Sequence, residues 1–180
     1  MKYMFASDIH GSAYYCREML RAFREEKADR LVLLGDLLYH GPRNDLPKDY
    51  APKEVIAMLN EVKDFIYAVR GNCEAEVDQM VLEFPVMADY CILVLDQKTF
   101  YATHGHVYNQ DHLPPIQKGD ILIHGHTHVY KAERKENYIL LNPGSVSIPK
   151  EGNPPTYAVV QDGTFLIKDF EGKIRKELQL

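Results

Sequence analysis

The sequence predicts an α/β (α+β) protein with two mixed β-sheets packed together and helices on the outside. Its first half alternates short apolar runs with helical patterns, a β-α-β-α-β order that is typical of parallel strands joined by crossover helices. Its second half contains short strand-like segments, some separated by tight-turn sequences, as in antiparallel hairpins. No linker divides the chain, so residues 1–180 are expected to form a single domain.

The first half begins with a short apolar run over 2–7, which predicts a buried strand. A helix is expected over 12–26, because apolar and aromatic side chains recur there at helical spacing and Ser12 can cap its N-terminus. The same reasoning gives, in chain order, a strand at 31–34, a proline-containing loop at 39–52, a helix at about 53–63 and a strand at 65–69.

The second half predicts a larger number of strands. Segments 89–95 and 99–103 are separated by Asp96-Gln97-Lys98 and are typical of a hairpin. Asp162-Gly163 is a second hairpin turn signal. Further strands are expected at 120–124, 129–134, 138–142, 156–161 and 164–170.

Composition excludes several classes of protein. The formal net charge of −5 and the pI of about 5.9 argue against an extended nucleic-acid-binding surface, which is usually basic. Three widely spaced cysteines with no Cys-x-x-Cys pair argue against a disulfide framework or a structural zinc site. No apolar run approaches the ~18 residues that a membrane span needs. The short apolar start before Asp8 is not a signal peptide, so we expect a cytoplasmic protein.

Metal-binding residue types occur repeatedly just after the predicted strands. Because ligand sites of α/β proteins form at the carboxyl ends of strands, these side chains are expected to converge on one cleft. Imidazole and carboxylate ligands together suit manganese, iron, zinc or cobalt. Asp36 stands alone behind its strand and is the natural bridge between two cations. The seven candidate metal ligands are Asp8, His10, Asp36, Asn72, His104, His126 and His128.

These residues lie in five ordered motifs that resemble those of the calcineurin-like metallophosphoesterase superfamily. The motifs are Asp8-Ile9-His10, Gly35-Asp36, Gly71-Asn72, His104-Gly105-His106 and Gly125-His126-Thr127-His128. The resemblance extends from residue 5 to residue 147, and stretches 4–12, 40–44 and 142–150 are similar to a bacterial phosphodiesterase branch of that superfamily. It implies a four-layer αββα sandwich and a metal-dependent phosphoric diester hydrolase that prefers manganese.

The resemblance also implies a role for each ligand. Asp8, His10 and His128 would hold the first metal, Asn72, His104 and His126 the second, and Asp36 would bridge them. A hydroxide between the metals would attack phosphorus. Asp36, Asn72 and His104 are therefore also the candidate catalytic residues. The cofactor would be two divalent cations, manganese first, with Zn²⁺, Fe²⁺, Ni²⁺, Co²⁺ or Mg²⁺ as alternatives.

One position departs from the family pattern. Many members carry a histidine after the asparagine, where it can protonate the leaving oxygen, whereas this chain has Cys73 followed by Glu74. A thiol serves that role poorly, which implies a preference for good leaving groups or an acid from elsewhere. Glu74 is expected to orient His10 from behind.

Four further residues are candidates for contact with the substrate, and three of them could instead have a structural role. Arg43, Asn44, Cys73 and His106 are the candidate substrate-binding residues. Arg43 and Asn44 could instead fasten a proline-rich loop to the body of the protein, and His106 could support a metal ligand from behind or line the pocket. The segment Asn142-Pro143-Gly144-Ser145 is expected to pack behind the metal-bearing loops.

A small phosphodiester is the expected substrate, but the sequence is also compatible with other functions. The fold also occurs in a retromer subunit that serves mainly as an interaction surface, so a metal-binding scaffold is the first alternative. A phosphomonoesterase or a nuclease is the second, although the acidic charge gives no sign of a basic groove. Exposed strand edges or apolar patches could also support a homo-oligomer.

Overall fold

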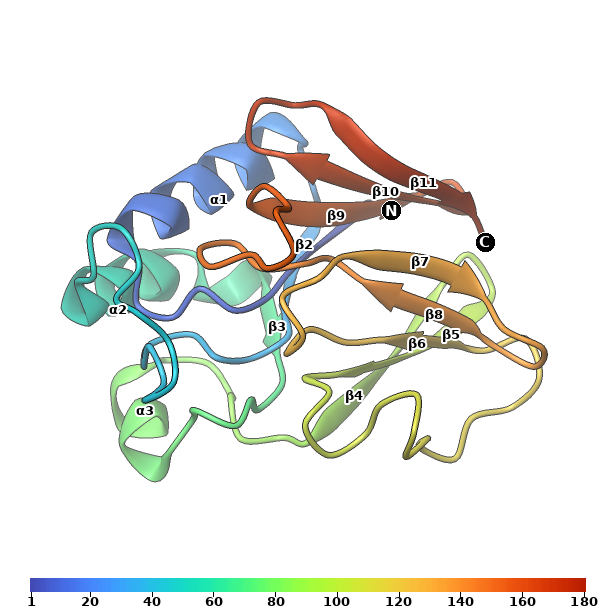
Figure 1. Ribbon diagram of the computed structural model, residues 1–180, viewed down its shortest axis with the longest axis horizontal. Coiled ribbons are helices and arrows are strands. Elements are labelled where there is room, and N and C mark those ends of the chain that lie inside the picture. The colour runs from blue at the N-terminus through green and yellow to red at the C-terminus, as the bar shows by residue number, and fades with distance from the viewer.

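Two mixed β-sheets lie face to face in the computed structural model, which describes residues 1–180 (Figure 1). The larger sheet has six strands in the order β11-β10-β9-β1-β2-β3. Strands β1, β2 and β3 are parallel, and β9, β10 and β11 are added antiparallel on the other side of β1. The bounds are β1 Tyr3–Ala6, β2 Arg30–Leu33, β3 Ile66–Ala68, β9 Thr156–Gln161, β10 Thr164–Asp169 and β11 Ile174–Gln179.

The second sheet has five strands in the order β4-β5-β6-β8-β7. Its centre is parallel, because β5, β6 and β8 run in one direction, while β4 and β7 pair antiparallel at the two edges. The bounds are β4 Tyr90–Leu95, β5 Lys98–Thr103, β6 Ile121–Ile123, β7 Lys131–Arg134 and β8 Ile139–Asn142.

All three α-helices precede β4 in the chain: α1 (Ala13–Glu25), α2 (Pro52–Glu61) and α3 (Glu76–Val81). Helix α1 begins at its predicted cap, where the Ser12 hydroxyl accepts from the Tyr15 backbone N–H at 3.2 Å. Its apolar face packs on the outer side of the larger sheet together with α2. None of these helices is long and apolar enough to cross a bilayer.

Strand β1 contributes to both hydrophobic cores. Because successive side chains of a strand point to opposite faces, Met4 and Ala6 lie in the core beneath α1, whereas Tyr3 and Phe5 lie in the core between the sheets. Between the sheets, Phe5 stacks on Phe100 of β5 with ring centroids 6.1 Å apart. The two sheets are therefore joined directly behind the segments that leave β1 and β5.

The predicted class of two mixed sheets flanked by helices is confirmed. Every predicted strand is present, and the hairpins turn where expected. The β4–β5 turn is tighter than predicted: Asp96 and Gln97 alone form it, with φ of 49° and 64°, and Lys98 already belongs to β5.

Besides a three-residue 3-10 helix at Lys63–Phe65, one α-helix and one strand were not predicted. Helix α3 has only six residues, none of them buried, and so carries little apolar periodicity. Strand β11 is an edge strand whose side chains are all exposed or half-buried, which weakens the alternation that reveals a strand.

Phe100→Ala should destabilise the protein by about 3–5 kcal/mol, because the ring is fully buried between the sheets and its loss leaves a cavity. The measurement is urea unfolding followed by circular dichroism. Val94→Ala on neighbouring β4 is the control, because Val94 is 70% exposed and should change the unfolding free energy by less than about 1 kcal/mol. Equal effects of the two substitutions would contradict the packing described between the sheets.

Candidate metal centre

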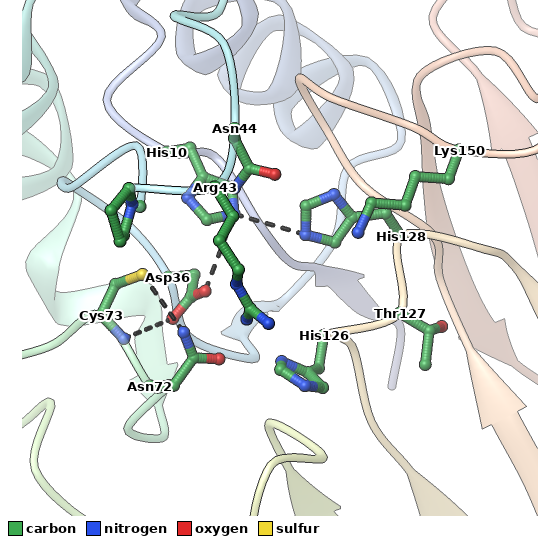
Figure 2. Close-up of a pocket in the computed structure, with 12 residues that line it drawn as sticks. His10, Asp36, Arg43, Asn44, Asn72, Cys73, His126, Thr127, His128 and Lys150 are labelled. Carbon is green, nitrogen blue, oxygen red and sulfur yellow. Dashed lines mark hydrogen bonds and ion pairs between the residues drawn. The ribbon is translucent and has the colours of Figure 1, made fainter.

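The seven predicted ligands meet in one cleft, on segments that follow strands of both sheets. The segments after β1, β2 and β3 approach it from the larger sheet, and those after β5 and β6 approach it from the smaller one. The cleft has a volume of about 410 Å³ and is lined by 12 residues, of which one is hydrophobic (Figure 2). Asp8 and His104 are fully buried, whereas the other five predicted ligands line the cleft.

The first group of ligand atoms comes from Asp8, His10 and His128. The Nε2 atoms of His10 and His128 lie 3.6 Å and 3.2 Å from Oδ1 of Asp8, and 3.4 Å from each other. Ligand atoms that share one cation at about 2.1 Å are separated by roughly 3.0–3.4 Å, so this spacing fits a bound metal ion.

The second group surrounds Nε2 of His104. Oδ1 of Asn72 and Nδ1 of His126 each lie 3.1 Å from that atom, and Oδ2 of Asp36 lies 3.5 Å away. The same Oδ2 atom is also 3.7 Å from Nε2 of His10, which belongs to the first group. Asp36 is thus the residue whose carboxylate reaches both groups.

Backbone carbonyls fix the orientation of three of the four imidazoles. Nδ1 of His10 donates to the carbonyl of Tyr39 at 2.8 Å, Nδ1 of His104 donates to that of Leu34 at 2.6 Å, and Nδ1 of His128 donates to that of Ile148 at 2.7 Å. A carbonyl can only accept, so each Nδ1 carries the proton and each neutral ring presents its Nε2 lone pair to the cleft. This is the tautomer that can bind a metal through Nε2.

The centre concentrates groups that a cation would satisfy. Oδ1 of Asp8 is buried without a hydrogen-bond partner, and the facing Nε2 atoms of His10 and His128 cannot bond to each other when both are unprotonated. Burial opposes ionisation of Asp8, but the facing His10 and His128 rings outweigh it and hold its pKa well below the usual value. Buried carboxylates are stable only when paired or metal-bound, so the residues present fit divalent cations.

His104 responds to the same negative charge. Burial by itself would lower its pKa, but the Asp36 and Asp8 carboxylates raise it to about 9. Neighbouring His126 shows the opposite shift, because burial and the nearby His104 lower its pKa to about 4. The carboxylates therefore favour positive charge beside Nε2 of His104, and a divalent cation would take the place of the proton there.

The backbone at the centre is held in an unfavourable conformation. Left-handed φ values cost a non-glycine residue on the order of 1 kcal/mol each and occur mainly where the surroundings enforce them. Five of the seven predicted ligands have them: Asp8 (59°), His10 (49°), Asp36 (56°), His126 (65°) and His128 (60°). Gly71 lies against this backbone, where a Cβ atom would overlap the carboxylate of Asp36.

Glu74 holds the bridging residue rather than His10. Its buried carboxylate accepts from the backbone N–H groups of Asp36 at 2.8 Å, Leu37 at 2.7 Å and Gly71 at 2.5 Å. Burial, with the nearby Asp36 charge, raises the pKa of Glu74 despite these bonds. The expectation that Glu74 orients His10 is wrong, because the carbonyl of Tyr39 does so.

The segment Asn142–Ser145 packs behind the ligand loops, as predicted, and Ser147 extends the contact. The hydroxyls of Ser145 and Ser147 both donate to the carbonyl of Asp8, at 2.9 Å and 3.1 Å. The Asn142 amide donates to the carbonyl of Gly125 at 2.9 Å, directly before His126 in the chain.

The candidate substrate contacts separate into two sets. Arg43 and Cys73 line the cleft, and Figure 2 shows the Arg43 side chain directed toward the space between Asn72 and His126. The Asn44 side chain lines the cleft too, but its amide donates to the carbonyl of His40 at 2.8 Å and so braces the loop.

His106 is placed differently from the other histidines. Its ring packs 5.4 Å from the ring of His104 and does not line the cleft. Thr127 and Lys150 line the cleft although neither was selected from the sequence as a site residue. Lys150 gave no signal of its own, because its place depends on how the segment after Ile148 folds onto His128.

Known proteins with similar sequences and structures point to the same chemistry. The family model of the calcineurin-like phosphoesterase superfamily domain matches residues 1–163. The chain is 48% identical over 162 residues to the phosphodiesterase YfcE of Escherichia coli K12, covering 90% of this chain and 88% of that protein. A phosphodiesterase of Methanocaldococcus jannaschii is 24% identical over 152 residues, covering 80% of this chain and 83% of that protein.

Solved structures agree with the sequence relatives. The structure described as YfcE, a phosphoesterase from E. coli, matches with a TM-score of 0.97 and 44% identity, covering 99% of both chains. A Vps29 structure from Entamoeba histolytica matches with a TM-score of 0.64 over 100% of this chain and 99% of that one, but at 19% identity it shows the fold alone. With nine-tenths of its length in the family model and the ligand motifs assembled in one cleft, this chain belongs to the calcineurin-like phosphoesterase superfamily.

Proposed function

We propose that this protein is a metal-dependent phosphodiesterase with two divalent cations in the cleft. Asp8, His10 and His128 hold the first, and Asn72, His104 and His126 hold the second. The observation that carries the proposal is the position of Asp36, whose Oδ2 lies 3.7 Å from Nε2 of His10 and 3.5 Å from Nε2 of His104. A single carboxylate oxygen between two ligand groups suits a bridge between two metal ions.

The contacts in the cleft indicate which part of the reaction the cations and each residue would carry. When bound, the cations supply a water of lowered pKa and neutralise charge on the phosphoryl oxygens. Asp36, Asn72 and His104 are the candidate catalytic residues, since Oδ1 of Asn72 and Oδ2 of Asp36 lie 3.1 Å and 3.5 Å from Nε2 of His104 and the three would hold the second cation together. Arg43 is the candidate phosphate contact, because its planar guanidinium matches phosphate oxygens in pairs.

The finer assignments of the same proposal are manganese as the preferred metal, a small phosphodiester as substrate and a cytoplasmic location. Residues 1–180 would act as one catalytic domain, since both hydrophobic cores draw on strands from the two ends of the chain. Diester specificity is supported by the phosphodiesterase YfcE, to which the chain is 48% identical. The three cysteines are free, which suits a reducing compartment.

Metal-stripped protein should not hydrolyse bis(4-nitrophenyl) phosphate, and turnover should return when one divalent cation is re-supplied, most strongly with Mn²⁺. Parallel assays with Mg²⁺, Zn²⁺, Ni²⁺ and Co²⁺ identify the metal, and 4-nitrophenyl phosphate is the matching monoester. A diester rate at least about 10-fold above the monoester rate is expected. Metal binding by calorimetry without turnover of either ester would contradict the proposal and favour a scaffold.

Asp36→Asn should abolish diester hydrolysis, with a loss of at least about 1,000-fold, because the amide cannot supply a charged bridge to both ligand groups. The fold should be retained, since Asp36 takes part in neither hydrophobic core. The measurements are turnover and metal stoichiometry, with circular dichroism as the control for folding. Unchanged stoichiometry and retained turnover would remove Asp36 from the bridging role.

Cys73→His should raise the rate for diesters with poor alkyl leaving groups by at least about 10-fold more than for 4-nitrophenyl esters. Burial, together with the nearby Asp36 carboxylate, raises the pKa of the Cys73 thiol, so the native side chain is a weak proton donor. An imidazole at the same wall of the cleft could protonate the departing alkoxide. The measurement is kcat/KM against leaving-group pKa, and an equal effect on all leaving groups would show that position 73 does not face the leaving oxygen.

A further inference from the structure

Two cationic side chains line the cleft without an acidic partner. Arg43 and Lys150 form none of the ion pairs in the structure, and no side-chain hydrogen bond satisfies either of them. A cation kept free beside a metal centre is available to bind an anion.

The backbone of Lys150 is fixed to a predicted metal ligand. Its backbone N–H donates to the carbonyl of His128 at 3.1 Å, and Nδ1 of His128 donates to the carbonyl of Ile148 at 2.7 Å. Asn153 closes the turn with its backbone N–H and its side-chain amide, which both donate to the carbonyl of Lys150. The base of the Lys150 side chain is therefore held at a set place on the rim of the cleft.

The two cations face different parts of the cleft. Figure 2 shows Arg43 reaching into the middle, toward Asn72 and His126, whereas Lys150 lies beside the ring of His128. Arg43 is thus directed at the place where the reacting phosphate would sit. Lys150 lies to one side of that place, where one of the two alcohol substituents of a diester would extend.

The cleft has a different character on the side of Cys73. That residue also lines an adjoining groove of about 420 Å³, in which eight of ten lining residues are hydrophobic. Figure 2 places Cys73 and Lys150 on opposite sides of the cleft. A substrate that spans both sides would meet apolar side chains at one end and a free ammonium group at the other.

We propose that Lys150 is a specificity-determining residue that binds a second anionic group, a carboxylate or a phosphate carried on one alcohol of the diester. This inference rests on the proposed phosphodiesterase function. A simple diester has one negative charge, which the metal centre and Arg43 already meet. The Lys150 ammonium then has no partner unless the substrate supplies another anion, while an apolar leaving group occupies the side of Cys73.

Three 4-nitrophenyl diesters that differ only in the second alcohol test the proposal. The second alcohol carries a carboxylate (2-carboxyethyl), no charge (propyl) or a quaternary ammonium (2-trimethylammonioethyl). The metal-loaded wild-type enzyme should have a KM for the carboxylate ester about three- to tenfold below that for the propyl ester, the range of a partly exposed ion pair. The ammonium ester should have the highest KM of the three.

Lys150→Gln should remove this order by raising KM for the carboxylate ester and lowering KM for the ammonium ester, so that the three values become similar. Lys150→Arg should keep the order, because it keeps the charge. Lys53→Gln is the matched control, since Lys53 is exposed on α2, forms no ion pair and does not line the cleft. Arg43→Gln should instead lower kcat/KM for all three esters to a similar extent.

Binding without turnover provides a second readout. Calorimetry with 3-phosphonopropionate and butylphosphonate, which differ in a terminal carboxylate and cannot be hydrolysed at the P–C bond, should give tighter binding of the former by about three- to tenfold. Lys150→Gln should make the two dissociation constants equal, and Lys53→Gln should not.

The outcomes separate this inference from the function on which it rests. Turnover of the propyl ester with no preference among the three substituents, or a preference that survives Lys150→Gln, would overturn the role of Lys150 and leave the phosphodiesterase intact. Failure of the propyl ester with every metal would instead contradict the phosphodiesterase itself. A substituent preference that disappears equally in Lys53→Gln would reduce the effect to net charge and also overturn the proposal.

Discussion

Two buried carboxylates, Asp8 and Asp36, impose the condition that the rest of the structure meets. Ionised groups with almost no exposed surface are stable only when surrounded by hydrogen-bond donors or positive charge. The backbone supplies donors: the N–H of His126 reaches Oδ2 of Asp8 and that of Cys73 reaches Oδ1 of Asp36. The other oxygen of each carboxylate is left facing imidazole nitrogens, and Oδ1 of Asp8 has no hydrogen-bond partner at all. That division, with one oxygen held by the chain and the other turned toward the cleft, makes the centre a receptor for cations.

The two-sheet architecture explains how such a centre stays rigid. The ligands come from segments that follow strands of both sheets, so a shift of one sheet against the other would pull the groups of ligand atoms apart. The stacked rings of Phe5 and Phe100 join the sheets three residues before Asp8 and four residues before His104. Left-handed backbone at five ligands is tolerated because this packing and the Glu74 contacts leave the loops no alternative path. A substitution that loosens the core between the sheets should therefore also disturb the geometry of the candidate metal centre.

The sequence predicts the part of this site that depends on local pattern. Apolar runs locate the strands, and the rule that ligands follow strand ends is enough to bring Asp8, Asp36 and His104 to one place. Glu74 was also predicted to support the site, but through His10 rather than through the backbone of residues 36 and 37. Its hydrogen bonds to those residues form only when the segment after β3 lies beside the segment after β2. Lys150 likewise depends on a contact between separate segments, that with His128. Hydrophobic periodicity carries no information about contacts between distant segments, so the partners of Glu74 and Lys150 could not be predicted from the sequence.

The same contacts indicate where specificity can reside. A change at a ligand disturbs a connected set of bonds; His128, for example, is tied through its ring to Ile148 and lies against Asp8. The side chains of Arg43 and Lys150 contribute no bond to that set, although both line the cleft. The walls that carry the predicted ligands are therefore constrained by the fold, whereas the side chains of Arg43 and Lys150 are not. In the proposed assignment, different residues carry chemistry at phosphorus and choice of substrate, and only the first depends on the architecture that positions the predicted ligands.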